Sequence, residues 1–162
     1  MADDAVSIRR AGRDDVPAIV RLLADDDLGR AREDAREPLA PAYCDAFAAI
    51  EAQPGNQLLV ATLDGRVAGC LQLTLIPGLS RMGMLRAQVE AVRVDRHCRG
   101  RRIGELLMQH AIGLARAAGC GLVQLTTDRA RADAHRFYER LGFVPSHLGM
   151  KLQLDATTGK AP

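Results

Sequence analysis

The spacing of hydrophobic residues changes along the chain, and each change predicts a different element. Polarity alternates from Val6 to Arg10, which predicts a strand. Apolar residues then recur at helical spacing over residues 12–27, which predicts a helix capped by Asp14 or Asp15. A second helical pattern covers residues 38–55. The chain is therefore expected to open with one strand and two helices.

Two β-like runs within residues 56–77 surround the pair Asp64-Gly65. Because such a pair readily adopts the positive φ angles of a two-residue turn, it predicts a hairpin. Residues 78–86 show no period and predict an irregular loop or the ragged start of a strand. Residues 87–95 alternate in polarity and predict another strand.

The remaining chain alternates between helical and strand patterns. These predict a helix from about Ile103 to Gly119, a strand over 121–127, a short helix over 132–142 and strands over 143–154. The order of elements predicts one mixed α/β (α+β) domain over residues 1–154, with a mostly antiparallel, twisted central sheet and helices on both faces. Residues 155–162 are expected to form a polar C-terminal tail.

Composition narrows the class of protein without changing this outline. With 162 residues, 48% of them hydrophobic and 26% charged, the chain suits one globular domain. A net charge of +2 is too small to indicate a nucleic-acid partner. The N-terminus is polar, and no apolar run approaches the roughly 18 residues of a membrane span, so we expect neither a signal peptide nor a membrane partner. Four widely spaced cysteines without a CxxC pair indicate reduced thiols in a cytoplasmic protein, with no metal site.

The basic stretch "VDRHCRGRRIG" joins a predicted strand to the following helix. A helix N-terminus exposes unpaired N–H groups, and glycine lets the backbone approach an anion closely. Arg99, Arg101 and Arg102 add positive charge around Gly100 and Gly104, so this turn is a candidate phosphate cradle. It matches neither the Walker A nor the GxGxxG pattern. A solvated basic turn with a glycine cap is the alternative.

A second motif, "DAHRFYERLGF" at residues 133–143, follows one strand later. With the basic turn it resembles the GNAT superfamily of N-acetyltransferases, whose patterns are Q/R-x-x-G-x-G/A and A-x-x-x-Y-x-x-x-G-F. The matching residues are Arg99, Gly100, Ile103 and Gly104 in the first motif, and Ala134, Tyr138, Gly142 and Phe143 in the second. The order of elements from Val6 to Leu154 also fits this family. Residues 124–147 further resemble aminoalkylphosphonate N-acetyltransferases and many bacterial GNAT proteins.

Two positions depart from the family patterns. Arg102 stands where the family has its central glycine, and we expect it to keep ordinary helical dihedrals at the start of the helix. Arg131 stands seven residues before Tyr138, where the family often has an asparagine beside the pantetheine arm of the cofactor.

The resemblance implies an enzyme that transfers the acetyl group of acetyl-CoA to a primary amine, by direct attack in a ternary complex. The residues it assigns to acetyl-CoA binding are Val92, Val94, Arg99, Gly100, Arg101, Arg102, Ile103, Gly104, Arg131 and Phe137. The resemblance also places Tyr138 to protonate the leaving thiolate or to donate a hydrogen bond to its sulfur. A core tyrosine on an amphipathic helix is the alternative.

Glu90 is the candidate general base. A primary amine with a pKa of about 10.4 is mostly protonated near neutral pH, so a base or a water chain must remove a proton before attack. Glu90 precedes Val92 and Val94 by two and four positions. This spacing puts all three on one side of a strand unless a bulge intervenes. A solvent-facing carboxylate is the alternative.

The sequence leaves the charge of the acceptor open. An acidic stretch suits a cationic amine, whereas Arg81 and Arg86 suit an anionic group. The acidic residues are Asp25, Asp26, Asp27, Glu33 and Asp34.

A small-molecule amine is the leading acceptor, and a protein or peptide amine remains open. A non-catalytic CoA-binding module is the competing function. A nucleic-acid partner is not expected, because only 3% of residues are aromatic and no stacking platform is visible. A homodimer remains open.

Overall fold

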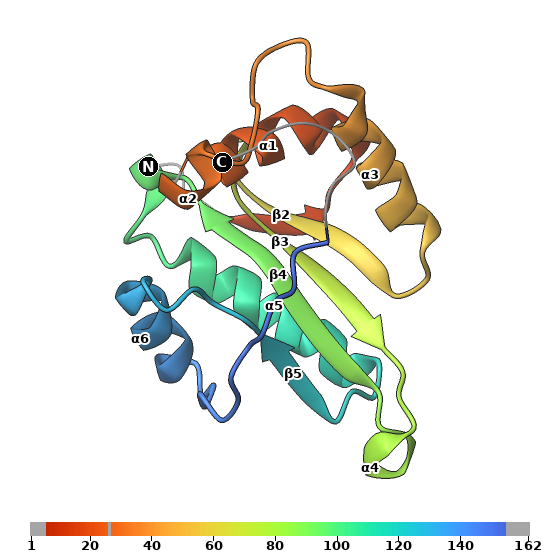
Figure 1. Cartoon of the computed structure of the whole chain (residues 1–162). Helices are drawn as coiled ribbons and strands as arrows, with labels where there is room; N and C mark the ends of the chain where they lie inside the picture. The colour runs from red at the N-terminus through yellow and green to blue at the C-terminus, as the bar shows by residue number, and fades with distance from the viewer. Residues whose placement is uncertain (1–5, 26, 155–162) are drawn as a thin grey trace. The chain divides into compact units, whose positions relative to one another are not determined.

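A computed structural model describes residues 6–25 and 27–154, and Figure 1 shows its elements along the chain. Contacts divide the chain between Leu125 and Thr126 into two compact units, each described by itself. The prediction of one domain over residues 1–154 stays a prediction, and the predicted tail at 155–162 lies outside the described residues. No helix among the described residues is long and apolar enough to cross a membrane.

The first unit contains most of the elements. They are β1 (Ser7–Arg10), η1 (Arg13–Asp15), α1 (Val16–Ala24), α2 (Asp27–Arg30), α3 (Pro41–Ala52), β2 (Asn56–Leu63), β3 (Arg66–Ile76), α4 (Ser80–Gly83), β4 (Arg86–Val94), η2 (Arg96–Cys98), α5 (Ile103–Ala117) and β5 (Leu122–Leu125). The second unit contains α6 (Ala132–Arg140).

The first unit is built on a five-stranded sheet with the strand order β1-β2-β3-β4-β5. Strands β1 to β4 pair antiparallel with their neighbours, whereas β4 and β5 are parallel. The parallel pair follows from the connection through α5, since parallel neighbours need a long crossover. The predicted mixed α/β class with a mostly antiparallel sheet is confirmed.

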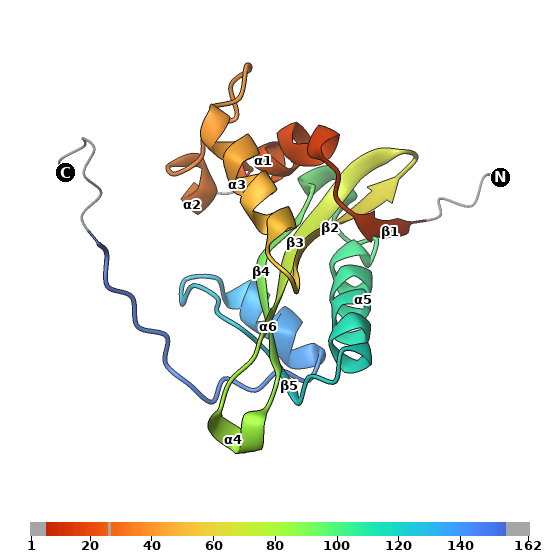
Figure 2. The same cartoon turned by 90° about the vertical axis from the view of Figure 1, so that its right-hand side faces the viewer.

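Helices cover both faces of this sheet: α5 lies on one face, and α1 and α3 lie on the other (Figure 2). On the α5 face, a Cβ atom at Gly69 would lie 3.0 Å from Leu107 Cδ1 and 3.1 Å from Ile103 Cγ2. Glycine at this position therefore lets α5 pack directly on β3. On the opposite face, Val60 and Cys70 belong to a buried cluster with residues of α1 and α3.

The hairpin between β2 and β3 forms where the sequence predicts it. Asp64 and Gly65 have φ angles of 51° and 75°, and Leu63 pairs with Arg66 across the turn. Two consecutive positive φ angles match the twist of the flanking strands, so this short turn fixes the register of the pair.

Asp15 contributes to the start of the first helix in a different way from the prediction. The helix α1 begins at Val16, and neither Asp14 nor Asp15 makes a side-chain cap to it. Instead the Asp15 carboxylate accepts a hydrogen bond from Gly12 N at 2.8 Å and pairs with Arg9 Nη1 at 2.7 Å. The predicted cap is therefore wrong, because the carboxylate satisfies donors that precede the helix.

The substitution Asp15→Asn should show how much the contacts of Asp15 with Gly12 and Arg9 contribute to stability. Hydrogen bonds from Arg9, with a smaller contribution from Gly12 N–H, hold the pKa of Asp15 below its usual value. We expect the substitution to lower the free energy of unfolding by about 1 kcal/mol at pH 7. Because the pKa of Asp15 is lower in the folded protein, its ionised carboxylate stabilises the fold at any pH above the unfolded-state pKa of about 4. This stabilisation is lost as the pH falls through the lower, folded-state pKa.

The difference in unfolding free energy between the wild type and Asp15→Asn should therefore shrink when urea denaturation is repeated near pH 2.5. Asp14→Asn is the matched control, since this exposed carboxylate makes no hydrogen bond or ion pair within the described chain. A difference that stayed constant with pH would contradict the assignment.

The tip of the β3–β4 connection is a left-handed turn rather than an ordinary helix. Within α4, Arg81 and Met82 have φ angles of 55° and 60°, and Gly83 follows with 78°. Leu79 and Met82 are fully exposed. The predicted irregular loop thus has a defined but unusual backbone, which no hydrophobic period would indicate.

The predicted C-terminal strands are not formed. In the second unit, Gly142 ends α6 with a φ angle of 90°, and none of the described residues from 143 to 154 belongs to a strand. Apolar side chains at alternate positions remain 77–94% exposed, namely Val144, Leu148, Met150, Leu152 and Leu154. The strand prediction was wrong because alternation selects a face, whereas a strand also needs hydrogen bonds from a neighbouring strand.

Candidate active site

The strand β4 contains an irregularity directly after the predicted base Glu90. The next residue, Ala91, has a φ angle of 54°. Glu90 lies opposite Gln72 of β3, whereas Arg93 lies opposite Cys70, so β4 has one residue more than β3 in this interval. This is a β-bulge, which interrupts the regular alternation of side chains along a strand.

The bulge changes which of the predicted site residues share a face. Glu90 and Arg93 lie on the face of Cys70, which is the face covered by α1 and α3. Val94 lies opposite Gly69 and therefore on the α5 face. The even spacing of Glu90 and Val94 does not place them on one side, because the bulge does intervene.

Glu90 belongs to a row of polar side chains on this sheet face. Gln72 lies directly opposite Glu90, and its amide donates a hydrogen bond to Asn56 Oδ1 at 2.9 Å. The Gln124 amide donates to Gln88 Oε1 at 2.7 Å across the parallel pair. We call this row the polar sheet face, and its members are Asn56, Gln72, Thr74, Gln88, Glu90 and Gln124.

The sequence analysis missed the polar sheet face apart from Glu90. A signal exists in "CLQLTLI" and "AQVEAV", where polar residues take every second position of otherwise apolar strands. Residues at alternate positions share one face of a strand. Amide donors and acceptors beside one exposed carboxylate suit a polar ligand that makes several hydrogen bonds.

The turn after β4 has the backbone that an anion site requires. Asp95 accepts a hydrogen bond from His97 N at 2.8 Å, which caps η2. Gly100 has a φ angle of 80°, and a Cβ atom there would meet no atom within 4 Å. The open turn leads into the N-terminus of α5, a helix of 15 residues that begins at Ile103. Because the first N–H groups of a helix lack intrahelical partners, the segment combines hydrogen-bond donors with open space where the sequence predicts a phosphate.

Arg102 does not have the helical dihedrals that the sequence analysis expects. Its φ and ψ angles are 59° and 13°, which is the left-handed region. Its guanidinium donates to both carboxylate oxygens of Glu105, at 2.9 and 2.8 Å, and these hydrogen bonds raise the pKa of Arg102. The expectation was wrong because the chain enters α5 through a left-handed residue, the conformation that glycine adopts without strain.

Substitution of Arg102 by glycine and by alanine should reveal this strain. Both changes remove the pair with Glu105, but only glycine avoids the left-handed penalty of about 1 kcal/mol. We expect the Arg102→Gly variant to be more stable than Arg102→Ala by about 1 kcal/mol in free energy of unfolding. Inside a helix alanine is the more stabilising of the two residues, so the expected order is the opposite. Urea denaturation of the two proteins measures the difference. An alanine variant equal to or more stable than the glycine variant would refute the proposed strain.

The other predicted cofactor residues of the first unit differ in accessibility. Ile103 is 1% exposed and packs under the sheet, so only its backbone can face an anion. Arg99 and Arg101 are exposed on the turn. The carbonyl of Val92 accepts a hydrogen bond from Arg93 Nη1 at 2.9 Å. The turn and the bulged strand both belong to the first unit, where the turn directly follows β4.

The second unit holds the remaining predicted site residues. On α6, the half-buried Tyr138 ring lies edge-on to Phe137 at 5.1 Å and to Phe143 at 5.9 Å between ring centroids. Arg131 immediately precedes the helix, and His135 Nε2 lies 2.9 Å from the Asp128 carbonyl oxygen. The grouping of Tyr138 with Glu90 stays a prediction.

Two carboxylates of the acidic stretch, those of Asp25 and Asp34, form ion pairs with arginines, and a third, Glu33, accepts a hydrogen bond. The Asp25 carboxylate pairs with Arg96 at 2.5 Å. The Tyr43 hydroxyl donates to Glu33 at 2.9 Å. Hydrogen bonds from Arg36 lower the pKa of Asp34 to about 2. Asp26 lies outside the described residues, as does the side chain of Asp27. These partners weaken the interpretation that the stretch attracts a cationic amine.

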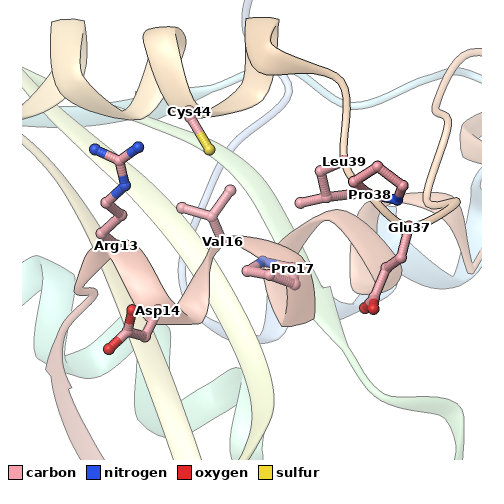
Figure 3. Close-up of a pocket in the computed structure, with 8 residues that line it drawn as sticks. All are labelled: Arg13, Asp14, Val16, Pro17, Glu37, Pro38, Leu39 and Cys44. Carbon is pink, nitrogen blue, oxygen red and sulfur yellow. The ribbon is translucent and has the colours of Figure 1, made fainter.

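A pocket of about 410 Å³ lies between the start of α1, the helix α3 and the segment before it (Figure 3). Its lining residues are Arg13, Asp14, Val16, Pro17, Glu37, Pro38, Leu39 and Cys44. None of them belongs to β4 or to the turn that follows. The pocket therefore does not coincide with the predicted catalytic and cofactor residues.

Comparison with known proteins identifies a family that matches most of this chain. The model of the Acetyltransferase (GNAT) family matches residues 18–143. A solved structure described as a transcriptional regulator from Bacillus halodurans C-125 is 45% identical, with a TM-score of 0.90 over 93% of this chain and 100% of that chain.

Two curated enzymes are also similar. Aminoalkylphosphonate N-acetyltransferase of Salmonella typhimurium is 35% identical over 106 residues, which are 65% of this chain and 68% of that protein. Glucosamine 6-phosphate N-acetyltransferase of Trypanosoma brucei brucei is 32% identical over 90 residues, which are 56% of this chain and 59% of that protein.

Proposed function

Since the chain belongs to the acetyltransferase (GNAT) family, we propose that it transfers the acetyl group of acetyl-CoA to a small-molecule primary amine in a ternary complex. The observation that carries this proposal is the position of Glu90. Its exposed carboxylate lies on the polar sheet face, one residue before the bulge, in the strand that leads to the anion-binding turn.

In this proposal Glu90 removes a proton from the ammonium group, directly or through water. The neutral amine then attacks the thioester carbonyl carbon, so that a C–N bond forms and the C–S bond breaks. A bulge takes a residue out of the strand ladder, which leaves an N–H group near Val92 for the developing charge on the carbonyl oxygen. Tyr138 donates a proton or a hydrogen bond to the departing sulfur.

The proposed site for the phosphates of acetyl-CoA is the turn from Arg99 to Gly104. The positive φ angle of Gly100 and the empty space beside its Cα leave room for a phosphate against the backbone. The first turn of α5 adds N–H groups and the positive end of a helix dipole. Arg99 and Arg101 supply exposed positive charge around it.

The acceptor is proposed to carry a phosphonate or phosphate group. The two curated relatives are named for an aminoalkylphosphonate and for glucosamine 6-phosphate, and both molecules combine an amine with a phosphorus oxyanion. The ion pairs of Asp25 and Asp34 reduce the negative charge that would repel such a substrate. Amides of the polar sheet face offer donors and acceptors for its remaining polar atoms.

A cytoplasmic location belongs to the same proposal, and the free thiols of the four cysteines support it. A homodimer stays a prediction. A protein or peptide amine as acceptor, and a non-catalytic CoA-binding module, are the alternatives that the experiment must separate.

The experiment is release of CoA thiol from acetyl-CoA across a panel of amines. The panel contains aminoalkylphosphonates, glucosamine 6-phosphate, polyamines, amino acids, aminoglycosides and a lysine peptide. We expect the phosphonate or phosphate amines to react fastest. Turnover of the peptide alone would favour a protein acceptor. Tight binding of acetyl-CoA without turnover of any amine would favour the non-catalytic module.

A further inference from the structure

One ion pair joins the anion-binding turn to a helix that is distant in sequence. Arg96 Nη2 of η2 lies 2.5 Å from Asp25 Oδ1 at the end of α1. The strand β4 and the turn after it pass beside the end of α1 (Figure 1). By contrast, the pair of Arg102 with Glu105 is local, within one turn of helix.

The location of Asp25 is unfavourable for a helix considered by itself. Asp25 is the C-terminal cap residue of α1, and its N–H donates to the Leu22 carbonyl oxygen. The negative end of the helix dipole repels an anion at this position. The Asp25 side chain is nevertheless only 19% exposed, compared with 57% for Arg96. Local helix stability does not explain an aspartate there, whereas a contact with Arg96 does.

The pair gives the turn a second anchor beside the sheet. Upstream, Asp95 holds His97 N–H at 2.8 Å, and downstream Ile103 is buried under β3. Arg96 lies between these two points and attaches η2 to α1. Between these anchors lies Gly100, where open space leaves room for the phosphates to approach the backbone N–H groups.

We propose that Asp25 and Arg96 form a positioning pair, which holds the anion-binding turn against the end of α1 and so sets the affinity for CoA. The proposal rests on the proposed function, because it assigns the turn to CoA. The proposal gives the arginines of the turn two different roles. Arg96 binds the carboxylate of Asp25, whereas Arg99, Arg101 and the backbone N–H groups bind the phosphates. A change in the position of the end of α1 would therefore change the affinity of the turn for CoA.

Isothermal titration with CoA, combined with thermal unfolding, tests this proposal in the full chain. We expect Asp25→Asn and Arg96→Gln each to raise the Kd for CoA about fivefold. The double variant should show the same Kd as either single variant, because both changes break one contact. Arg96→Lys should restore part of the affinity. The unfolding temperature of Asp25→Asn should stay within a degree or so of the wild type, since the lost ion pair is offset by removal of a negative charge from a helix C-terminus. Arg96→Gln should lower it, because the Asp25 carboxylate is only 19% exposed and loses its partner.

Glu37→Gln is the matched control. It breaks another ion pair of α1, between Arg21 and Glu37 at 3.2 Å, and should leave the Kd for CoA unchanged. Tighter or equal CoA binding by Asp25→Asn, with weaker binding by Arg96→Gln, would overturn the proposal and make Arg96 a direct phosphate ligand. Lower unfolding temperatures with unchanged CoA affinity would also overturn it. If the wild type bound no CoA, the proposed function itself would fail.

Discussion

Replacement of Glu90 by glutamine is expected to lower kcat/KM for acetyl transfer about 100-fold at pH 7, which is the lower end of the range for loss of a general base. Glutamine keeps the size of the side chain and one accepting oxygen but cannot take up the proton of an ammonium group. Glu90 is exposed, and the change should therefore leave folding intact. Thiol release from acetyl-CoA with the best amine of the panel measures the loss.

The pH dependence of the Glu90→Gln variant distinguishes a base from a binding group. The deficit should narrow as the pH approaches the amine pKa of about 10.4, because solvent then supplies the neutral amine. Glu51→Gln, on the exposed side of α3, is the control for removal of one surface carboxylate and should react like the wild type. An equal deficit at every pH, with a raised KM for the amine, would assign Glu90 to amine binding instead of proton transfer.

Replacement of Tyr138 by phenylalanine is expected to lower kcat about 30-fold while leaving the KM for acetyl-CoA almost unchanged. The effect should be smaller than the loss of about 100-fold or more typical of a general acid. At reference values the phenol pKa of about 10 exceeds that of a thiol at about 8.5, so proton transfer to the thiolate is uphill. A hydrogen bond from the phenol to the sulfur then supplies part of the stabilisation.

Tyr43→Phe is the matched control for Tyr138→Phe, because the chain contains two tyrosines. The Tyr43 hydroxyl donates to Glu33 and accepts from Asp34 N, so its loss should lower stability by about 1 kcal/mol and leave kcat unchanged. Comparison of kcat and unfolding free energy for the two variants separates the roles. A Tyr138→Phe protein with unchanged kcat and reduced stability would make Tyr138 a packing residue.

Local chemistry explains which elements could be predicted from the sequence. The turn at Asp64-Gly65 and the long helix from Ile103 depend on neighbours in the chain, and both form as predicted. The bulge at Ala91 depends on the register against β3, which hydrophobic alternation does not encode. The segment from Leu148 to Leu154 alternates like a strand, but alternation carries no information on whether a sheet edge is paired with it.

In the candidate site too, the sequence does not indicate features that depend on contacts between distant parts of the chain. The motif places Arg102 on the turn, but the spacing of residues in the motif does not indicate its left-handed backbone. Gln72 lies opposite Glu90 only because two strands meet in one register. The spacing of residues in a motif therefore predicts which segment carries the candidate site. The pairing of β3 with β4 decides which side chains lie together there.

Cys70 provides an internal reporter for the strand that carries this chemistry. The thiol is fully buried, lies 3.6 Å from the Ala91 carbonyl oxygen at the bulge, and has a pKa raised by burial to about 12. The other three cysteines are partly exposed. Alkylating reagents need a thiolate that they can reach. Because the thiol also belongs to the buried cluster with residues of α1 and α3, the slow phase of alkylation would time the opening of that cluster from the sheet in the native protein, without any attached probe.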